Sequence, residues 1–194
     1  MIETMQKAVL MSIRPKWASL ILSGEKTVEV RKSFPPMVYL PFRVYLYETM
    51  APAEIPWMDE DGHIIFKGRG MVIGEFLCDE IYDICWADAG GYYYIRPGED
   101  HDLRETMLKY DEMRSYLGDQ DGYGWHVSEL RVYERPKPLT QFRRPCRNEL
   151  YCESCGMYNA HRGRCGNAAL QLKRPPQSWC YVAEKEDAAN GQET

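Results

Sequence analysis

The stretch SIRPKWASLILSGEKTVEVRKS, residues 12–33, carries a helical pattern followed at once by a strand pattern. We expect the helix to begin at Pro15, because the first helical turn needs no N–H at that position. Apolar residues then recur at helical spacing up to Ser23-Gly24, a typical helix end. A short apolar run before the helix, Ala8 to Ile13, predicts a strand.

Residues 26–31, KTVEVR, alternate between polar and apolar side chains. This period of two is typical of a half-buried strand, with Val28 and Val30 on one face. If the valines face the core, we expect the other face to line an accessible cleft; its side chains are Thr27, Glu29 and Arg31.

The rest of the chain is rich in strand patterns. Further strands are predicted over residues 42–49, 64–66, 71–76, 124–133 and 178–182. We expect the turn 67–70 to join two of them as a hairpin. Residues 85–101 have an irregular composition, and residues 103–117 a helical one.

Many strands, two short helices and no βαβ alternation predict an α+β fold, a small mixed β-barrel. We expect one domain over residues 8–183, preceded by an extension at residues 1–7. Residues 184–194, EKEDAANGQET, have no apolar anchor and predict a disordered acidic tail.

Composition and charge narrow the classes of protein. Apolar residues at 44% and charged residues at 27% exclude a wholly disordered chain and a collagen-like repeat. The net charge of −5 means that nucleic acid could bind only through a local basic cleft. The N-terminus lacks a signal-peptide pattern, and no apolar run is long enough to cross a bilayer. We therefore expect a cytoplasmic protein without membrane contact.

Four of the seven cysteines are spaced C-x5-C-x2-C-x9-C: Cys146, Cys152, Cys155 and Cys165. The C-x2-C spacing lets two thiolates hold one metal ion, and four thiolates suit tetrahedral zinc. We expect a structural zinc site that staples an insertion at residues 143–177. The alternatives are a 4Fe–4S cluster on the same sulfurs, His161 in place of one cysteine, or no metal. Basic residues around the cluster are predicted to contact a nucleic-acid backbone: Arg143, Arg144, Arg147, Arg162, Arg164, Lys173 and Arg174.

The motif Gly24-x-Lys26-Thr27-x-Glu29-x-Arg31, after a short helix that comes behind the first strand, resembles the signature of the ASCH domain family of the PUA-like superfamily. Two later segments, YGWHVSELRVYERPKPL at 123–139 and PPQSWCYV at 175–182, are similar to the later segments of bacterial and phage members. The resemblance covers residues 8–145 and 175–183.

This resemblance implies a PUA-like pseudobarrel with a cleft beside the motif. Related domains bind RNA or recognise modified bases. A subset of small ASCH proteins are amidohydrolases that deacylate acetylated cytidine with a Lys, a Thr and a Glu. Lys26 matches that Lys, but Glu29 stands at the position of the nucleophilic Thr. The resemblance therefore does not carry Thr-based covalent chemistry over to this chain.

Lys26, Glu29 and Arg31 would form the centre of a ligand site. The two cations can hold a phosphate or a carbonyl group, and Glu29 can accept hydrogen bonds from the N–H edge of a base. Arg14 and Lys16, at the start of the helix, would add positive charge to the same mouth. The alternative is an ion pair of Glu29 with Lys26 or Arg31 that only ties the strand to the loop.

The other ligand-site candidates are Thr27 of the motif and four rings suited to stacking on a base: Trp17, Tyr123, Trp125 and Trp179. Taken singly, each ring is favoured as core or rim packing over a stacking surface. His126 comes directly after Trp125 and so faces the opposite side of its strand. We interpret it as a structural residue, with catalysis as the alternative.

These residues are compatible with two classes of function. The first is a binding module whose cleft recognises RNA or a modified nucleobase or nucleoside. The second is a hydrolase acting on a modified nucleoside or on RNA, with Lys26 and Glu29 as proton-transfer or electrostatic groups. A protein-interaction role is a third option, and the sequence leaves the oligomeric state open.

Overall fold

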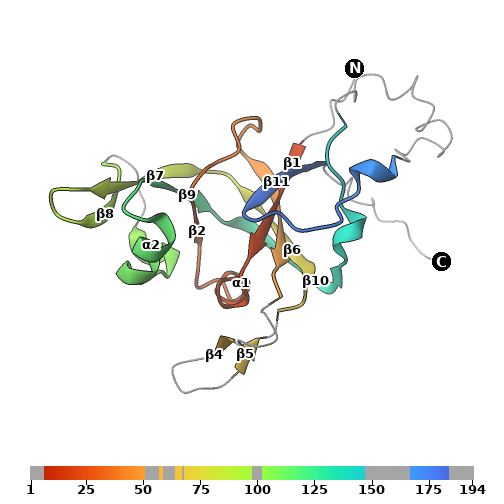
Figure 1. Ribbon diagram of the computed structural model, residues 1–194, viewed down its shortest axis with the longest axis horizontal. Helices are drawn as coiled ribbons and strands as arrows, with labels where there is room; N and C mark the ends of the chain where they lie inside the picture. The colour runs from red at the N-terminus through yellow and green to blue at the C-terminus, as the bar shows by residue number, and fades with distance from the viewer. Residues whose placement is uncertain are drawn as a thin grey trace.

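The structure of the chain is a computed structural model that describes residues 7–50, 57–58, 64–66, 68–97, 102–146 and 167–183. These ranges hold eleven β-strands, two α-helices and three 3-10 helices. Most strands belong to two open sheets that lie next to each other in the middle of an elongated molecule (Figure 1). The predicted α+β class is therefore confirmed.

The first sheet has five strands in the order β10-β6-β3-β1-β11. Its strands are β10 (Ser128–Lys137), β6 (Met71–Cys78), β3 (Phe42–Glu48), β1 (Lys7–Ile13) and β11 (Trp179–Ala183). All neighbours are antiparallel except β1 and β3, which run parallel. The helix α1 (Pro15–Leu22) belongs to the connection between β1 and β2, as the sequence predicts.

The second sheet has four antiparallel strands in the order β2-β9-β7-β8. Its strands are β2 (Val28–Arg31), β9 (Gly122–His126), β7 (Ile81–Ala87) and β8 (Tyr92–Ile95). The 3-10 helix η1 (Leu103–Thr106) and the helix α2 (Tyr110–Leu117) cover one face of this sheet. A separate ribbon pairs β4 (Trp57–Met58) with β5 (Ile64–Phe66).

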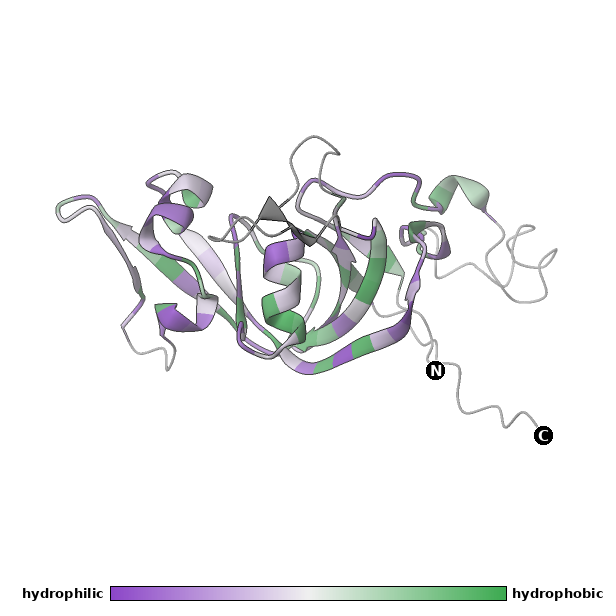
Figure 2. Cartoon of the chain, turned by 90° about the horizontal axis from the view of Figure 1, so that it is seen from below, coloured by the Kyte–Doolittle hydropathy of each residue, from purple (hydrophilic) through white to green (hydrophobic). Residues whose placement is uncertain are grey.

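Strand periodicity divides the core into clusters on either side of the first sheet. Val44 and Leu46 of β3 point into a cluster shared with α1 and Trp125 of the second sheet. Tyr45 and Tyr47 point to the opposite face. That face is covered by a strap around η2 (Leu139–Gln141) and η4 (Ala168–Leu170), which contributes buried residues such as Phe142. Because both faces are covered, strands such as β1 (KAVLMSI) carry apolar residues on both faces. Hydrophobic residues, drawn in green, are accordingly frequent along the strands (Figure 2).

The start of the second sheet is positioned by the end of α1. Gly24 adopts a φ of +79°, a left-handed conformation that favours glycine, and so reverses the chain after the helix. The amide of Lys26 then donates to the carbonyl oxygen of Leu20 at 2.9 Å. This turn presents Lys26 at the entrance of β2.

Several expectations about the fold are corrected. The described strands form no closed barrel, because both main sheets have free edges. Residues 64–66 and 71–76 do not form a hairpin with each other: β5 pairs with β4, and β6 inserts between β3 and β10. The chain enters β6 through Gly70, whose amide donates to the Glu48 carbonyl oxygen at the end of β3 (3.1 Å).

Three further segments differ from their sequence patterns. Residues 85–101 were expected to be irregular, but β7 and β8 form a regular hairpin there. The helix expected over 103–117 is interrupted at Met107, which has a φ of 55°. The single strand expected over 124–133 is split at Val127, because β9 pairs in the second sheet and β10 in the first.

The two ends of the predicted insertion at 143–177 lie side by side. An isolated bridge pairs Arg143 with Gln171, and the Leu172 amide donates to the Phe142 carbonyl oxygen at 2.9 Å. The predicted extension, apart from Lys7, and the predicted tail at 184–194 lie outside the described residues. In the part of the chain that the structure describes, no helix has the length and apolar character needed to span a membrane.

The contact between β6 and β10 generates a stability prediction. A Cβ added at Gly74 would lie 2.7 Å from the backbone carbonyl oxygen of Arg131. We expect Gly74→Ala to lower the free energy of unfolding by about 1–3 kcal/mol, because two paired strands must move apart. Val132, its partner in the ladder, is 50% exposed, so Val132→Ala should change stability by no more than about 0.5 kcal/mol. Urea unfolding of both variants measures the difference, and equal effects would contradict the argument.

Candidate functional site

The strand β2 has the two-faced pattern that its sequence predicts, but both faces are covered. Val28 and Val30 pack with Met113 of α2 in one core cluster. Glu29 and Arg31 point to the other face and are only 7% and 5% exposed. The expectation that this polar face is openly accessible is therefore corrected. On this face, Ser12 of β1 and Ser178, the residue before β11, contact Arg31.

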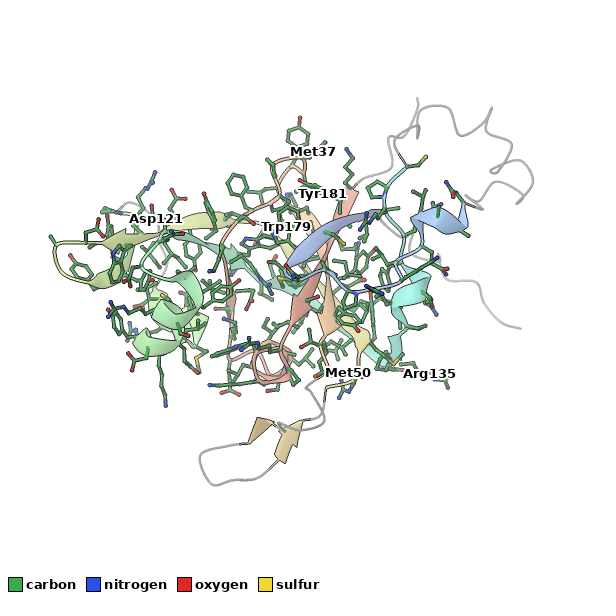
Figure 3. All side chains as sticks on the ribbon, in the orientation of Figure 1. Met37, Met50, Asp121, Arg135, Trp179 and Tyr181 are labelled. Carbon is green, nitrogen blue, oxygen red and sulfur yellow. The ribbon has the colours of Figure 1, made fainter. Side chains whose placement is uncertain are left out.

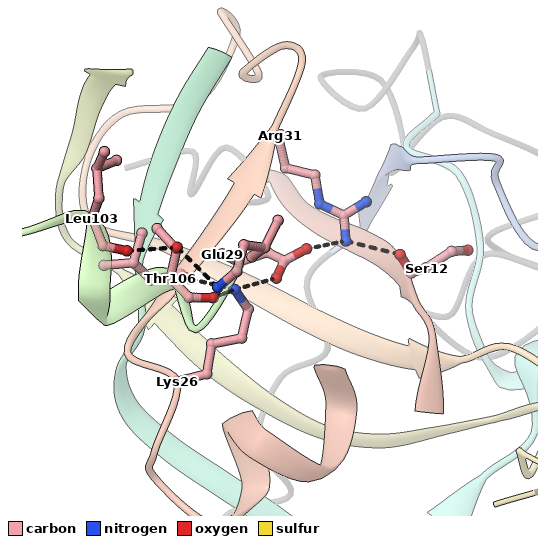
Figure 4. Close-up of polar contacts among 8 residues, drawn as sticks. Ser12, Lys26, Glu29, Arg31, Leu103 and Thr106 are labelled. Carbon is pink, nitrogen blue, oxygen red and sulfur yellow. Dashed lines mark hydrogen bonds and ion pairs between the residues drawn. The ribbon is translucent and has the colours of Figure 1, made fainter. Parts of the chain in front are cut away.

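The ammonium group of Lys26 is held by three oxygen atoms (Figure 4). Nζ donates to the carbonyl oxygens of Val28 at 2.7 Å and Thr106 at 2.5 Å. The Glu29 carboxylate lies 3.3 Å from the same nitrogen. Lys26 is 1% exposed, and the Trp17 ring lies with its centroid 5.4 Å from Nζ. The loop, β2 and η1 are thus joined at one buried cation.

Glu29 also contacts the second cation of the motif. Its Oε1 accepts from Arg31 Nη2 at 2.9 Å. The same Nη2 donates to the Ser12 carbonyl oxygen of β1 at 2.8 Å, and Nη1 lies 3.4 Å from Ser178 Oγ. Lys26, Glu29 and Arg31, named here the Lys–Glu–Arg cluster, therefore converge (Figure 4). Glu29 is ion-paired with both cations, as in the structural alternative that the sequence left open.

Burial shifts the protonation of groups in and beside this cluster. It lowers the pKa of Lys26, because desolvation penalises the ammonium form, while the Glu29 carboxylate opposes that shift. Burial raises the pKa of Tyr116 of α2, and the nearby Arg31 guanidinium opposes that shift. The neutral amine form of Lys26 is therefore populated at a lower pH than that of an exposed lysine.

The four aromatic candidates gather around the Lys–Glu–Arg cluster. The register of β2 with β9 places Trp125 opposite Glu29 and Tyr123 opposite Arg31, so these side chains share one face. Trp179 packs on Trp125 with ring centroids 6.2 Å apart, and Trp17 contacts the same core cluster. Trp125 is 0% exposed, which corrects its assignment as a stacking surface: its ring is part of the core. Trp17, Tyr123 and Trp179 are half-buried.

The structure places the other candidates at the margin of the site. Lys16 forms an ion pair with Glu112 of α2 at 2.6 Å, so its charge is largely balanced. Arg14 is exposed at the N-cap of α1. Thr27 is half-buried, and its carbonyl oxygen accepts from the Val127 amide at 2.8 Å. His126 lies on the Val28 face of the sheet, away from Glu29, with Nδ1 2.7 Å from Asp79 Oδ1.

Sequence reasoning missed four residues that complete the site. Thr106 supplies a carbonyl oxygen to Lys26 from 80 residues away in the chain. Tyr116 of α2 interacts electrostatically with Arg31, while Ser12 of β1 and Ser178, the residue before β11, contact it directly. No local pattern marks these residues, because their contacts depend on how the two sheets and η1 pack.

The charge and hydrogen bonding of the site are unbalanced. The Lys–Glu–Arg cluster has two cations and one anion within a buried space. Among the buried side-chain atoms of the described residues, Arg31 Nε and Trp125 Nε1 are donors without a hydrogen-bond partner. Both come from the face that holds Glu29. Buried N–H groups are normally paired, so these two donors are exceptions to the usual pattern.

The predicted metal centre lies almost entirely outside the described residues. Cys152, Cys155 and Cys165, and also His161, fall in the undescribed segment 147–166. Cys146 is a half-buried free thiol. The described residues contain no group of three or more potential metal ligands. The zinc site, and the alternative 4Fe–4S cluster on the same cysteines, stay predictions.

The protein thus has an α+β fold of two open sheets, and the residues of its G-x-K-T-x-E-x-R motif form the buried Lys–Glu–Arg cluster. The sequence profile of the ASCH domain matches residues 11–137, well over half of the chain. The chain belongs to the ASCH domain family, as its motif predicts.

Two solved structures of an ASCH protein are similar to this chain. A crystal structure of ASCH from Zymomonas mobilis is 21% identical, with 90% of this chain and 86% of that chain covered and a TM-score of 0.49. A single-residue variant of that protein is 20% identical, with 91% and 89% covered and a TM-score of 0.51. At this identity the likeness concerns the fold alone. No curated protein shows a significant match to this chain.

The Lys–Glu–Arg cluster generates a second stability prediction. Glu29→Gln removes the carboxylate between two buried cations and leaves both without their counter-charge. We expect the free energy of unfolding to fall by about 3–5 kcal/mol. The matched control is Glu25→Gln in the same loop, an exposed residue that should change stability by about 0.5 kcal/mol or less. Chemical unfolding tests both, and a fall in the control as large as in Glu29→Gln would contradict this account.

Proposed function

We propose that this ASCH domain is a binding module for RNA, or for a nucleobase or nucleoside, and that the ligand's polar edge meets the Lys–Glu–Arg cluster. The observation that carries the proposal is the pair of unpartnered buried donors, Arg31 Nε and Trp125 Nε1. Leaving a buried donor unsatisfied costs about 1–3 kcal/mol. A ligand with acceptor atoms, such as a base carbonyl or a phosphate oxygen, would recover that cost.

The charge of the cluster supports the same class of ligand. Both oxygens of Glu29 already contact cations, Oε1 with Arg31 and Oε2 with Lys26. The site therefore presents mainly donors and an excess of one positive charge. This favours an electron-rich or anionic group over a cationic one.

Aromatic rings around the cluster support a planar ligand. Trp17, Tyr123 and Trp179 are half-buried, so each retains some exposed surface. Phe34, 41% exposed, packs edge-to-face on Tyr123 with ring centroids 4.9 Å apart. Stacking of a base on such rings contributes about 1–3 kcal/mol per base. Polar recognition and stacking would then act on the same ligand.

The binding prediction is tested with cytidine, N4-acetylcytidine and a 12-nucleotide single-stranded RNA. Trp125→Phe keeps a ring but removes the unpartnered N–H, and should weaken binding about 2- to 10-fold. Trp17→Ala removes a stacking surface and should weaken it about 5- to 100-fold. Calorimetric titration gives the affinities.

Tyr39→Ala is the control for these variants, because Tyr39 is 94% exposed and outside the cluster. Thermal unfolding shows whether each variant is folded. Wild-type protein that binds none of the three probes, or folded variants that bind them all as well as wild type, would refute the proposed function.

A second candidate function is favoured by the burial of Lys26. Its lowered pKa makes the neutral amine available as a general base, with Glu29 beside it as an electrostatic group. This supports hydrolysis of a modified nucleoside or of RNA. Because the neutral amine is the active form, the rate should rise as pH rises through the pKa of Lys26.

The hydrolase prediction is tested by incubating the protein with N4-acetylcytidine and with RNA and separating the products by chromatography. Lys26→Met, which keeps the size of the side chain, should abolish turnover. Lys32→Ala, an exposed lysine one residue beyond β2, should leave the rate unchanged. Absence of turnover in the wild type, or turnover that persists in Lys26→Met, would remove this candidate.

A further inference from the structure

Although the net charge of the chain is −5, two ends of the molecule have net charges of opposite sign. Figure 3 places Asp121 and Arg135 toward opposite ends of the long axis. The Asp121 end comprises β7, β8, η1 and α2, and we name it the acidic end. The Arg135 end comprises β10 and the strap over the first sheet, residues 128–146 and 167–174, and we name it the basic end. The Lys–Glu–Arg cluster lies between them, on β2 and the loop before it (Figure 1).

The acidic end would repel a polyanion. Over residues 81–97 and 102–121 the sequence has eight carboxylates against four basic side chains. Three of the four basic residues are ion-paired within this end: Arg96 with Asp83 at 2.8 Å, Arg104 with Asp102 at 2.6 Å and Arg114 with Asp119 at 2.7 Å. Their charges are therefore largely balanced, and the excess that is left is negative.

The basic end has the opposite composition. Residues 128–146 and 167–174 contain seven basic side chains and two carboxylates, Glu129 and Glu134. Arg135, Arg144, Lys173 and Arg174 are exposed. The bridge between Arg143 and Gln171 joins the two segments of the strap, and so brings basic residues that are distant in sequence onto one part of the molecule. Glu75 of β6 contacts Arg43 at 2.5 Å and lies 3.9 Å from Arg131, which balances only part of this charge.

A short segment connects the basic end to the Lys–Glu–Arg cluster. Ser178 Oγ lies 3.4 Å from Arg31 Nη1, and the Pro176 carbonyl oxygen accepts from Ser12 Oγ at 2.6 Å. Arg174 is four residues before Ser178, which is a reach of about 14 Å at full extension. Residues 174–178 therefore run from the cluster directly to exposed basic side chains.

The geometry points to a path for single-stranded RNA: with one base at the Lys–Glu–Arg cluster, its phosphate backbone runs along residues 174–178 to Arg174, Lys173 and Arg144, and not toward α2. This inference rests on the proposed function and adds the direction of the strand and the residues that contact its phosphates. Phosphate contacts by basic side chains position a strand without reading its sequence. They also make affinity depend on salt, because each contact releases counterions.

The test measures the affinity of a 12-nucleotide single-stranded RNA across a series of salt concentrations. The basic-end variant carries Arg144→Gln, Lys173→Gln and Arg174→Gln. Loss of three phosphate contacts should reduce the slope of log affinity against log salt by about 2. The control carries Arg96→Gln, Arg104→Gln and Arg114→Gln, which changes the net charge equally but at the acidic end. Its slope should equal that of the wild type.

Cytidine, which has no phosphate, separates this inference from the proposed function. The basic-end variant should bind cytidine as the wild type does. If the basic-end variant binds cytidine as the wild type does and its salt slope for RNA is unchanged, the path is overturned and the proposed function stands. The same conclusion follows if the salt slope falls equally in both triple variants. If the wild type binds neither cytidine nor RNA, the proposed function is overturned, and the path with it.

Discussion

The structure depends on one buried carboxylate, that of Glu29, placed between two buried cations. Lys26 and Arg31 are each fixed by this carboxylate and by backbone carbonyl oxygens from other elements, Thr106 of η1 and Ser12 of β1. Two charges of one sign cannot be buried together at low cost. The carboxylate is therefore what allows the first sheet to pack against the Glu29 face of β2. The same three groups thus join the loop after α1, the second sheet and the edge of the first.

The proposed ligand site has its basis in the same cluster. A structural ion pair would be complete with one cation, but here a second cation and two unpartnered donors, Arg31 Nε and Trp125 Nε1, face the same region. Because the backbone already holds Lys26 and Arg31 in place, an incoming acceptor group would find its donors oriented in advance. Rings at the margin and the opposite charges of the two ends then favour a planar ligand on a polyanionic strand.

Much of this was predictable where the pattern is local. The helix at Pro15, the strand with Val28 and Val30 on one face, and the convergence of Lys26 with Glu29 and Arg31 all depend on residues within twenty positions of each other. The hairpin at 64–76 and the single strand at 124–133 were wrong for one reason. Apolar alternation indicates that a strand exists but not which strand it pairs with, and β6 and β10 pair with strands distant in sequence.

The sequence alone determined the family motif, the order of charges along β2 and the two blocks of opposite net charge, because each is written in adjacent or nearly adjacent residues. Only the tertiary structure decided that β2 is covered on both faces, that Trp125 belongs to the core, and that Thr106 and Tyr116 meet Lys26 and Arg31. Burial and long-range hydrogen bonds arise from the packing of whole elements, and no short stretch of residues specifies which surfaces will face each other.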